Sequence, residues 1–154
     1  MATHLKAGDK APAFSGADQD GNKVSLADFK GKKVVLFFYP ADDTPVCTVQ
    51  ACNLRDNHAL LKQHGYQVIG ISPDDSASHK KFEQKFSLPF PLVADPKRTI
   101  IEKYGVWGEK NMYGNTVIGL HRTTFVIDEK GVIGKIFLRP RNKQHAEEII
   151  KSGS

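Results

Sequence analysis

Cysteine is scarce in this sequence, which holds two in 154 residues. Two cysteines are too few for the disulfide frameworks that stabilise small secreted domains. No run of 18 apolar residues occurs, and the first residues lack the apolar core of a signal peptide. These absences predict a cytoplasmic protein with no membrane partner, in which the two cysteines are thiols and any disulfide between them is transient.

Long basic runs are also absent, although the net charge is +5. The lysines and arginines are scattered along the chain, and no nucleic-acid-binding motif accompanies them. We therefore expect no nucleic-acid partner, and salt-dependent retention on DNA would contradict that expectation. A metal site is not expected either, because two cysteines and the nearby His58 do not form a four-ligand set.

The composition that remains is that of one ordinary soluble domain. Hydrophobic residues make up 40% of the chain and charged residues 25%. A chain of this length can bury a full hydrophobic core without disulfides. Because no repeat, low-complexity segment or linker divides the sequence, we predict a single domain that covers residues 1–154.

Apolar runs alternate with helix signals, which predicts an α/β fold. The expected strands cover residues 33–39, 66–72 and 92–93, and hairpins are expected over residues 13–25 and 122–138. The expected helices cover residues 44–63, the segment from Ser76 to a break at Leu88, residues 97–104, and the segment from a cap at Asn142 to residue 151. Residues 105–120 are predicted to be a loop. Helices separate the apolar strands, so these should be parallel, in a mixed sheet with helices on both faces.

Cys47 lies where one of these helices is expected to begin. Thr44 is a favourable N-cap and Pro45 fits the first helical position, which puts Cys47 near the third. Unpaired backbone N–H groups and the positive end of the helix dipole favour a thiolate there. A lone cysteine is also commonly a small buried hydrophobic residue. Position alone therefore leaves a reactive and a structural interpretation open.

Cys52 follows five residues later, within the same predicted helix. The Cys-x4-Cys spacing argues against a dithiol of the Cys-x2-Cys type. Five helical residues rise ~7.5 Å and turn by about 500°, whereas a disulfide needs Cα atoms within about 7 Å of each other. If the two cysteines bond, the first turns of the helix must therefore unwind. Val46 and Thr48 are β-branched and make that start easier to open.

Around these residues the sequence resembles the peroxiredoxins, and most closely their bacterioferritin comigratory protein/peroxiredoxin Q branch. The family motif Pro-x3-Thr-x2-Cys is met by Pro40, Thr44 and Cys47, and the second cysteine of the branch by Cys52. The resemblance covers about residues 8–151. Further segments match the family in the same order, and they are residues 88–96, 104–107, 112–114 and 122–128.

The resemblance implies a thioredoxin-like fold, with a central mixed β-sheet flanked by helices and an N-terminal β-hairpin. It implies a thiol-dependent peroxidase that reduces hydrogen peroxide and alkyl hydroperoxides and is recycled by thioredoxin or a similar dithiol protein, without a cofactor. Cys47 would be the peroxidatic cysteine and Cys52 the resolving cysteine. Thr44 and Arg122 would bind the peroxide oxygens, and Pro40 would shield the thiolate.

Three residues depart from the pattern of that family. Val46 stands where glycine is usual, Gln50 where glutamate is usual, and Ala41 where lysine is frequent. Valine has less backbone freedom than glycine, and Gln50 removes a negative charge near the thiolate. These changes leave the type of reaction in place and bear on its rate and on the unwinding step.

Two other functions would use the same cysteines. A protein thiol–disulfide oxidoreductase would reduce insulin without peroxide. A peroxide-sensing redox switch would respond to peroxide with negligible turnover. Since both cysteines lie in one chain, a monomer is expected, with a dimer through exposed apolar residues around Trp107 as the alternative.

Several other polar residues are assigned no chemistry. Arg122 by itself would be a surface arginine on a strand. His58, His79 and His121 have no acidic partner at an obvious spacing and are expected to be structural. Asp42 and Asp43 are expected to be solvated loop residues.

Overall fold

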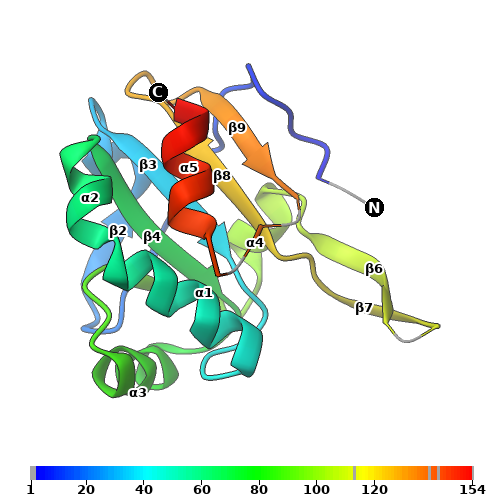
Figure 1. Cartoon of the computed structure of the whole chain (residues 1–154). Coiled ribbons are helices and arrows are strands. Elements are labelled where there is room, and N and C mark those ends of the chain that lie inside the picture. Colours follow the sequence, from blue (N-terminus) through cyan, green and yellow to red (C-terminus); the bar gives the residue numbers. More distant parts are fainter. Residues whose placement is uncertain (1–2, 113, 139, 142, 154) are drawn as a thin grey trace.

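The computed structural model describes residues 3–112, 114–138, 140–141 and 143–153 (Figure 1). Within these ranges no helix combines the length and the apolar character that crossing a membrane requires. The predicted cap of the last helix at Asn142 lies outside the described residues, as does Tyr113.

A five-stranded mixed sheet forms the centre of the molecule, in the order β5-β4-β3-β8-β9. The central strand β3 (Lys33–Phe38) runs parallel to β4 (Tyr66–Ser72) and antiparallel to β8 (Thr123–Ile127). Next to β4 lies β5 (Leu92–Ala94), in parallel, and next to β8 lies β9 (Ile133–Phe137), antiparallel. The predicted parallel pairs and the closing antiparallel hairpin are both confirmed.

Alternate residues of β3 enter two different hydrophobic layers, because successive side chains of a strand point to opposite faces of the sheet. Val35 and Phe37 pack with residues of α1, α2, α3 and α5. Leu36 and Phe38 pack with α4 and the N-terminal hairpin. Figure 1 shows α1, α2 and α5 in front of the sheet. The helices therefore cover both faces, as predicted. Their bounds are α1 Pro45–Asp56, α2 His58–Gln63, α3 Ser76–Phe86, α4 Thr99–Lys103 and α5 His145–Gly153.

The helix predicted over residues 44–63 is two helices. The break lies at Asn57, whose backbone has φ −109° and ψ 13°. Its side-chain amide donates to the carbonyl of Asn53 at 2.8 Å, beside the helical bond of 3.2 Å from the Asn57 N–H to the same carbonyl. A second correction concerns α3, where the capping side chain is Asp75 rather than Ser76: its carboxylate accepts from the N–H of Ser78.

The N-terminal hairpin is confirmed as β1 (Ser15–Ala17) and β2 (Lys23–Ser25), followed by the short 3-10 helix η1 (Leu26–Phe29). The prediction of a loop over residues 105–120 is wrong. Strands β6 (Trp107–Met112) and β7 (Asn115–Leu120) form an antiparallel hairpin that extends away from the central sheet (Figure 1). Backbone pairing holds it, and its glycines and polar residues lack the apolar alternation that a sequence pattern would show.

Candidate active site

Cys47 lies at the start of α1, which follows the central strand after a loop of residues 39–44. Thr44 occupies the N-cap position with extended backbone angles and Pro45 the first helical position, so Cys47 is the third helical residue. The side chain of Cys47 is 1% exposed. The hydroxyl of Thr44 makes no capping bond and donates instead to the carbonyl of Ala41 at 3.0 Å. The Thr44 side chain therefore accepts no hydrogen bond from the first backbone N–H groups of α1.

Arg122 directly precedes β8, the strand that pairs with β3, and its side chain contacts Cys47. Its Nη2 donates to Cys47 Sγ at 3.3 Å, although 75 residues separate the two in sequence. The contact follows from strand pairing, since Phe38 at the end of β3 faces Thr123, the neighbour of Arg122, on β8. A guanidinium that donates to sulfur stabilises the thiolate through a charge-assisted hydrogen bond. The structure thus gives Arg122 a contact that its position in the sequence does not reveal.

Gln50 accepts a hydrogen bond from the other terminal nitrogen of the Arg122 guanidinium. Its Oε1 accepts from Arg122 Nη1 at 3.2 Å, and the residue is fully buried. The side-chain Nε2 of Gln50 has no partner within the described residues. Gln50 lies three residues after Cys47, and residues three apart share a helix face, so this spacing was the available signal for its place in the site. As a neutral acceptor it orients Arg122 without adding a second negative charge beside the sulfur.

A hollow opens beside this cluster. It is lined by Pro40, Val46, Lys110, Leu120, His121, Arg122, Leu138 and Pro140. Val46 is 47% exposed there and Leu138 50%. The Nζ of Lys110 donates to the carbonyl of Leu120, whereas the buried Nε2 of His121 has no partner within the described residues. The hollow thus combines apolar walls with the guanidinium that contacts Cys47.

Cys52 lies on the same helix but is not bonded to Cys47. Both thiols are free, and Cys52 is half-buried. Burial raises the pKa of Cys52 above its ordinary value; Arg55 opposes that change and Asp56 adds to it. The intact α1 agrees with the expectation that this helix must open before the two sulfurs can meet.

The C-terminal part of α1 is anchored by Asn53. The Nδ2 of Asn53 donates to the carbonyl of Lys143 at 2.9 Å, and its Oδ1 accepts from the N–H of Ala146 at 2.9 Å. These bonds tie α1 to the beginning of α5. Asn53 therefore holds the C-terminal part of α1 in place if the end that carries Cys47 opens.

The structure corrects two expectations about polar residues near this loop, namely that Asp42 is solvated and that His79 has no acidic partner. Asp42 is not solvated: its side chain is 5% exposed and pairs with the fully buried His79 at 2.7 Å. The sequence spacing hid this pair, because the two residues lie 37 positions apart. Ligand-type atoms of Asp42, Asp74 and His79 lie within 4.8 Å of one another, close enough for a metal ion, but these side chains already form hydrogen bonds within the protein.

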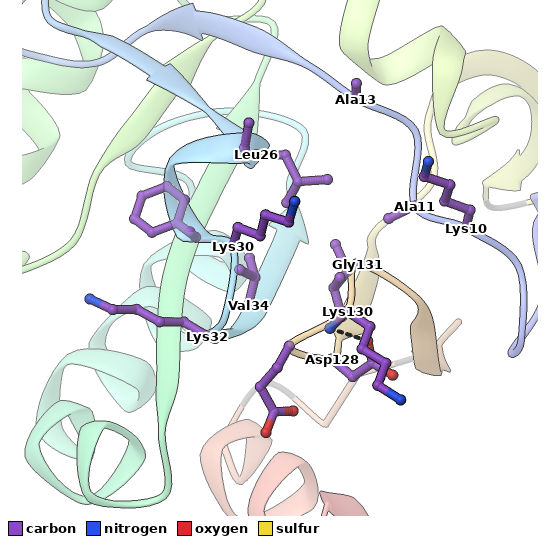
Figure 2. A pocket seen from close by; sticks show the side chains of 14 residues that line it. Lys10, Ala11, Ala13, Leu26, Lys30, Lys32, Val34, Asp128, Lys130 and Gly131 are labelled. Carbon is purple, nitrogen blue, oxygen red and sulfur yellow. Dashed lines mark hydrogen bonds between the residues drawn. The ribbon is translucent and has the colours of Figure 1, made fainter.

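Another hollow lies at the far end of the central strands (Figure 2). Leu26, Val34 and Ala11 line it, with the ammonium groups of Lys10 and Lys30 around them. Val34 is near the start of β3, whereas the loop that leads to Cys47 follows the end of that strand. This hollow contains none of the site residues that the sequence predicts, and its position separates it from the thiol chemistry.

Comparison with known proteins places this geometry in a family. Residues 7–136 match the AhpC/TSA family. Peroxiredoxin Bcp of Escherichia coli K12 is 46% identical over 146 residues, which cover 95% of this chain and 94% of that protein. A mutant of PrxQ from Xylella fastidiosa superposes with a TM-score of 0.89 at 29% identity, over 96% of this chain and 94% of that one.

The bacterioferritin comigratory protein of Xanthomonas campestris, studied for its alkyl peroxide reduction activity, superposes with a TM-score of 0.84. It is 28% identical, over 91% of this chain and 89% of that one. The family match, the identity to Bcp and these superpositions cover nearly the whole chain. The chain therefore belongs to the AhpC/TSA family and, within it, to the Bcp/peroxiredoxin Q group of thiol peroxidases.

Proposed function

We propose that this peroxiredoxin reduces hydrogen peroxide and alkyl hydroperoxides at Cys47, with Cys52 as the resolving cysteine and thioredoxin or a similar dithiol protein as the reductant. The observation that carries the proposal is the contact of 3.3 Å between Arg122 Nη2 and Cys47 Sγ at the start of α1. The hollow beside it, with Pro40 and Val46 in its wall, offers room for the organic group of a hydroperoxide. The activity described for the Xanthomonas protein supports the substrate class.

In the first step the Cys47 thiolate attacks one peroxide oxygen. A sulfur–oxygen bond forms while the oxygen–oxygen bond breaks, and the departing oxygen takes a proton to become water or an alcohol. Negative charge spreads over two oxygens in the transition state. Arg122 and the N–H groups at the start of α1 are placed to stabilise that charge. We assign Thr44 the role of a donor to the peroxide and Pro40 that of a shield.

In the second step the thiolate of Cys52 attacks the Cys47 sulfenic acid. The sulfur–sulfur bond forms, the sulfur–oxygen bond breaks, and hydroxide leaves and is protonated to water. The start of α1 must open for this, since both cysteines lie on one helix. The external dithiol then reduces the disulfide by exchange and becomes a disulfide itself. These steps require no metal and no organic cofactor.

Stopped-flow fluorescence combined with intact mass tests this sequence of events. Trp107 is the single tryptophan and lies at the start of β6, with the Arg98 guanidinium 4.4 Å from the centre of its ring. A fast, peroxide-dependent change in its fluorescence is expected, together with the loss of about two mass units that marks a disulfide. No reaction at millimolar peroxide would contradict the proposal and favour a binding function. Insulin reduction without peroxide would instead support the oxidoreductase alternative.

The variant Cys52→Ser is expected to consume one equivalent of peroxide and then stop. Cys47 should accumulate as sulfenic acid and, with excess peroxide, as sulfinic acid, because no second thiol in the chain can displace the oxygen. Mass spectrometry after stepwise addition of peroxide measures the added oxygens. Sustained turnover of this variant with thioredoxin alone would remove Cys52 from the mechanism, whereas the wild-type protein, treated alongside, should gain no oxygen.

The departure at Val46 leads to a separate prediction. In Val46→Gly the first turn of α1 should lose about 0.5 kcal/mol of helix propensity, so that disulfide formation after oxidation becomes about twofold faster. The rate of the second fluorescence phase measures this effect. Val49→Gly, a substitution of an exposed valine three residues further along the same helix, serves as the comparison. A slower second phase in Val46→Gly would contradict the proposed opening at this end.

The proposal also includes a monomer in the cytoplasm, folded as one domain over residues 1–154. Light scattering of the reduced and the oxidised protein decides the oligomeric state. A dimer in either state would direct attention to the hairpin that begins at Trp107.

A further inference from the structure

The carboxylate of Asp42 lies buried in the loop that joins β3 to α1, two residues before Thr44. Its Oδ1 accepts from the hydroxyl of Tyr39 at 2.6 Å. Its Oδ2 accepts from the hydroxyl of Ser78 and from Nδ1 of His79, each at 2.7 Å. Three polar side chains converge on this one carboxylate. The active-site loop is therefore held by a buried carboxylate whose partners are Tyr39, directly after β3, and Ser78 and His79 on α3.

His79 links this carboxylate to the sheet. Its Nδ1 lies 2.7 Å from Asp42 Oδ2, and its Nε2 lies 3.1 Å from the carbonyl oxygen of Val93. A carbonyl oxygen only accepts, so Nε2 donates to Val93. His79 therefore joins the active-site loop to β5 through α3.

A second connection anchors the backbone of the same loop. The N–H of Asp42 donates to Asp74 Oδ2 at 2.7 Å, and the hydroxyl of Ser72 donates to the same oxygen at 2.8 Å. Asp74 is the second acid near His79. The phenol oxygen of Tyr39 also lies 3.4 Å from Nδ1 of the His79 ring. Burial and the nearby Asp42 raise the pKa of Tyr39 well above its ordinary value, so its hydroxyl remains a donor. The buried pair of Asp42 and His79 is thus the centre of a hydrogen-bonded network.

An exposed ion pair joins the same loop to the same helix. Asp43 and Lys85 are 2.7 Å apart, but their side chains are 46% and 60% exposed, whereas those of Asp42 and His79 are 5% and 0% exposed. Solvent screens an exposed pair, and removal of one partner from a buried pair leaves an uncompensated charge. The buried pair should therefore control the loop, and the exposed pair provides a comparison that the chain itself supplies.

We propose that His79 is a positioning residue: through Asp42 it keeps the loop before α1 closed on Cys47, and the buried contact between the two side chains sets how fast the start of α1 opens for the disulfide with Cys52. This inference rests on the proposed function, in which the opening precedes attack by Cys52. A strong clamp favours oxidation of Cys47 in the closed site and delays resolution. Weakening the clamp should therefore shift the two steps in opposite directions.

The test measures both steps in single-turnover stopped-flow experiments with hydrogen peroxide. His79→Asn can keep a donor near the position of Nδ1 but removes the bond to Val93. Disulfide formation should become about tenfold faster and oxidation of Cys47 several-fold slower. Ser78→Ala removes one donor from Asp42 at a partly exposed position and should give a smaller change in the same directions. Lys85→Gln should leave both rates as in the wild-type protein.

A merely structural role of His79 would lower stability but would not accelerate a chemical step. The proposal is overturned if disulfide formation is unchanged or slower in both His79→Asn and Ser78→Ala while the wild-type protein forms its disulfide. If the wild-type protein forms no disulfide, the proposed function fails. Hydrogen exchange of the reduced protein then tests whether His79 holds the loop closed. Amides of residues 39–50 should then exchange faster in His79→Asn while those of α5 are unchanged; equal exchange would overturn the clamp.

Discussion

The variant Cys47→Ser is expected to lose peroxide consumption by at least about 10³-fold, to the level of the uncatalysed reaction. The sulfur is the atom that accepts the peroxide oxygen, and a serine hydroxyl at the same place is neither ionised at neutral pH nor readily oxidised. Arg122 and Gln50 would remain, yet they only orient and stabilise a nucleophile that is then missing. Peroxide loss in the presence of a dithiol reductant measures the effect.

The control for this variant is its fold. Cys47 is 1% exposed, and serine differs from it by one atom of similar size, so circular dichroism and thermal unfolding should show a native protein. Cys52→Ser shares the loss of one thiol but should retain the first oxidation. Normal turnover by Cys47→Ser would remove Cys47 from the reaction and would transfer the chemistry to Cys52.

The variant Arg122→Lys is expected to slow oxidation of Cys47 by roughly 10²-fold while the protein stays folded. Lysine keeps the positive charge but not the planar fork, and so cannot donate to Cys47 Sγ and Gln50 Oε1 at the same time. The loss should appear in the second-order rate constant for peroxide, since the guanidinium stabilises the thiolate and the transition state. Stopped-flow measurement of the first phase determines that constant.

Arg55→Lys provides the matched substitution for that measurement. Arg55 lies on α1 as well, but its guanidinium donates to Asp56 and to the carbonyl of Phe86. Its replacement should leave the oxidation step unchanged. If Arg122→Lys also oxidises at the wild-type rate, the contact of 3.3 Å is structural, and stabilisation of the thiolate must come from the start of α1 alone.

The limits of local patterns are visible at two places in the fold. Asn57 interrupts a predicted helix with non-helical backbone angles and a side-chain bond to the carbonyl of Asn53, neither of which apolar periodicity can indicate. The hairpin of β6 and β7 was predicted as a loop because strand pairing, rather than burial, defines it. Both errors concern elements whose hydrogen bonds, and not their hydrophobic faces, decide the structure. The confirmed elements, such as β3 and β4, are those with long apolar runs.

By itself the sequence determined where the chemistry begins: a buried strand, the Thr44-Pro45 signal and Cys47 in the first turn of the following helix are all local, and apolar patterning and backbone preference suffice to specify them. Which groups surround that sulfur was decided only by the tertiary structure. Arg122 meets Cys47 because β8 pairs with β3, and His79 meets Asp42 because α3 packs against the same end of the sheet. Such contacts join residues far apart in sequence, so they depend on the packing of the whole core, which no local pattern contains.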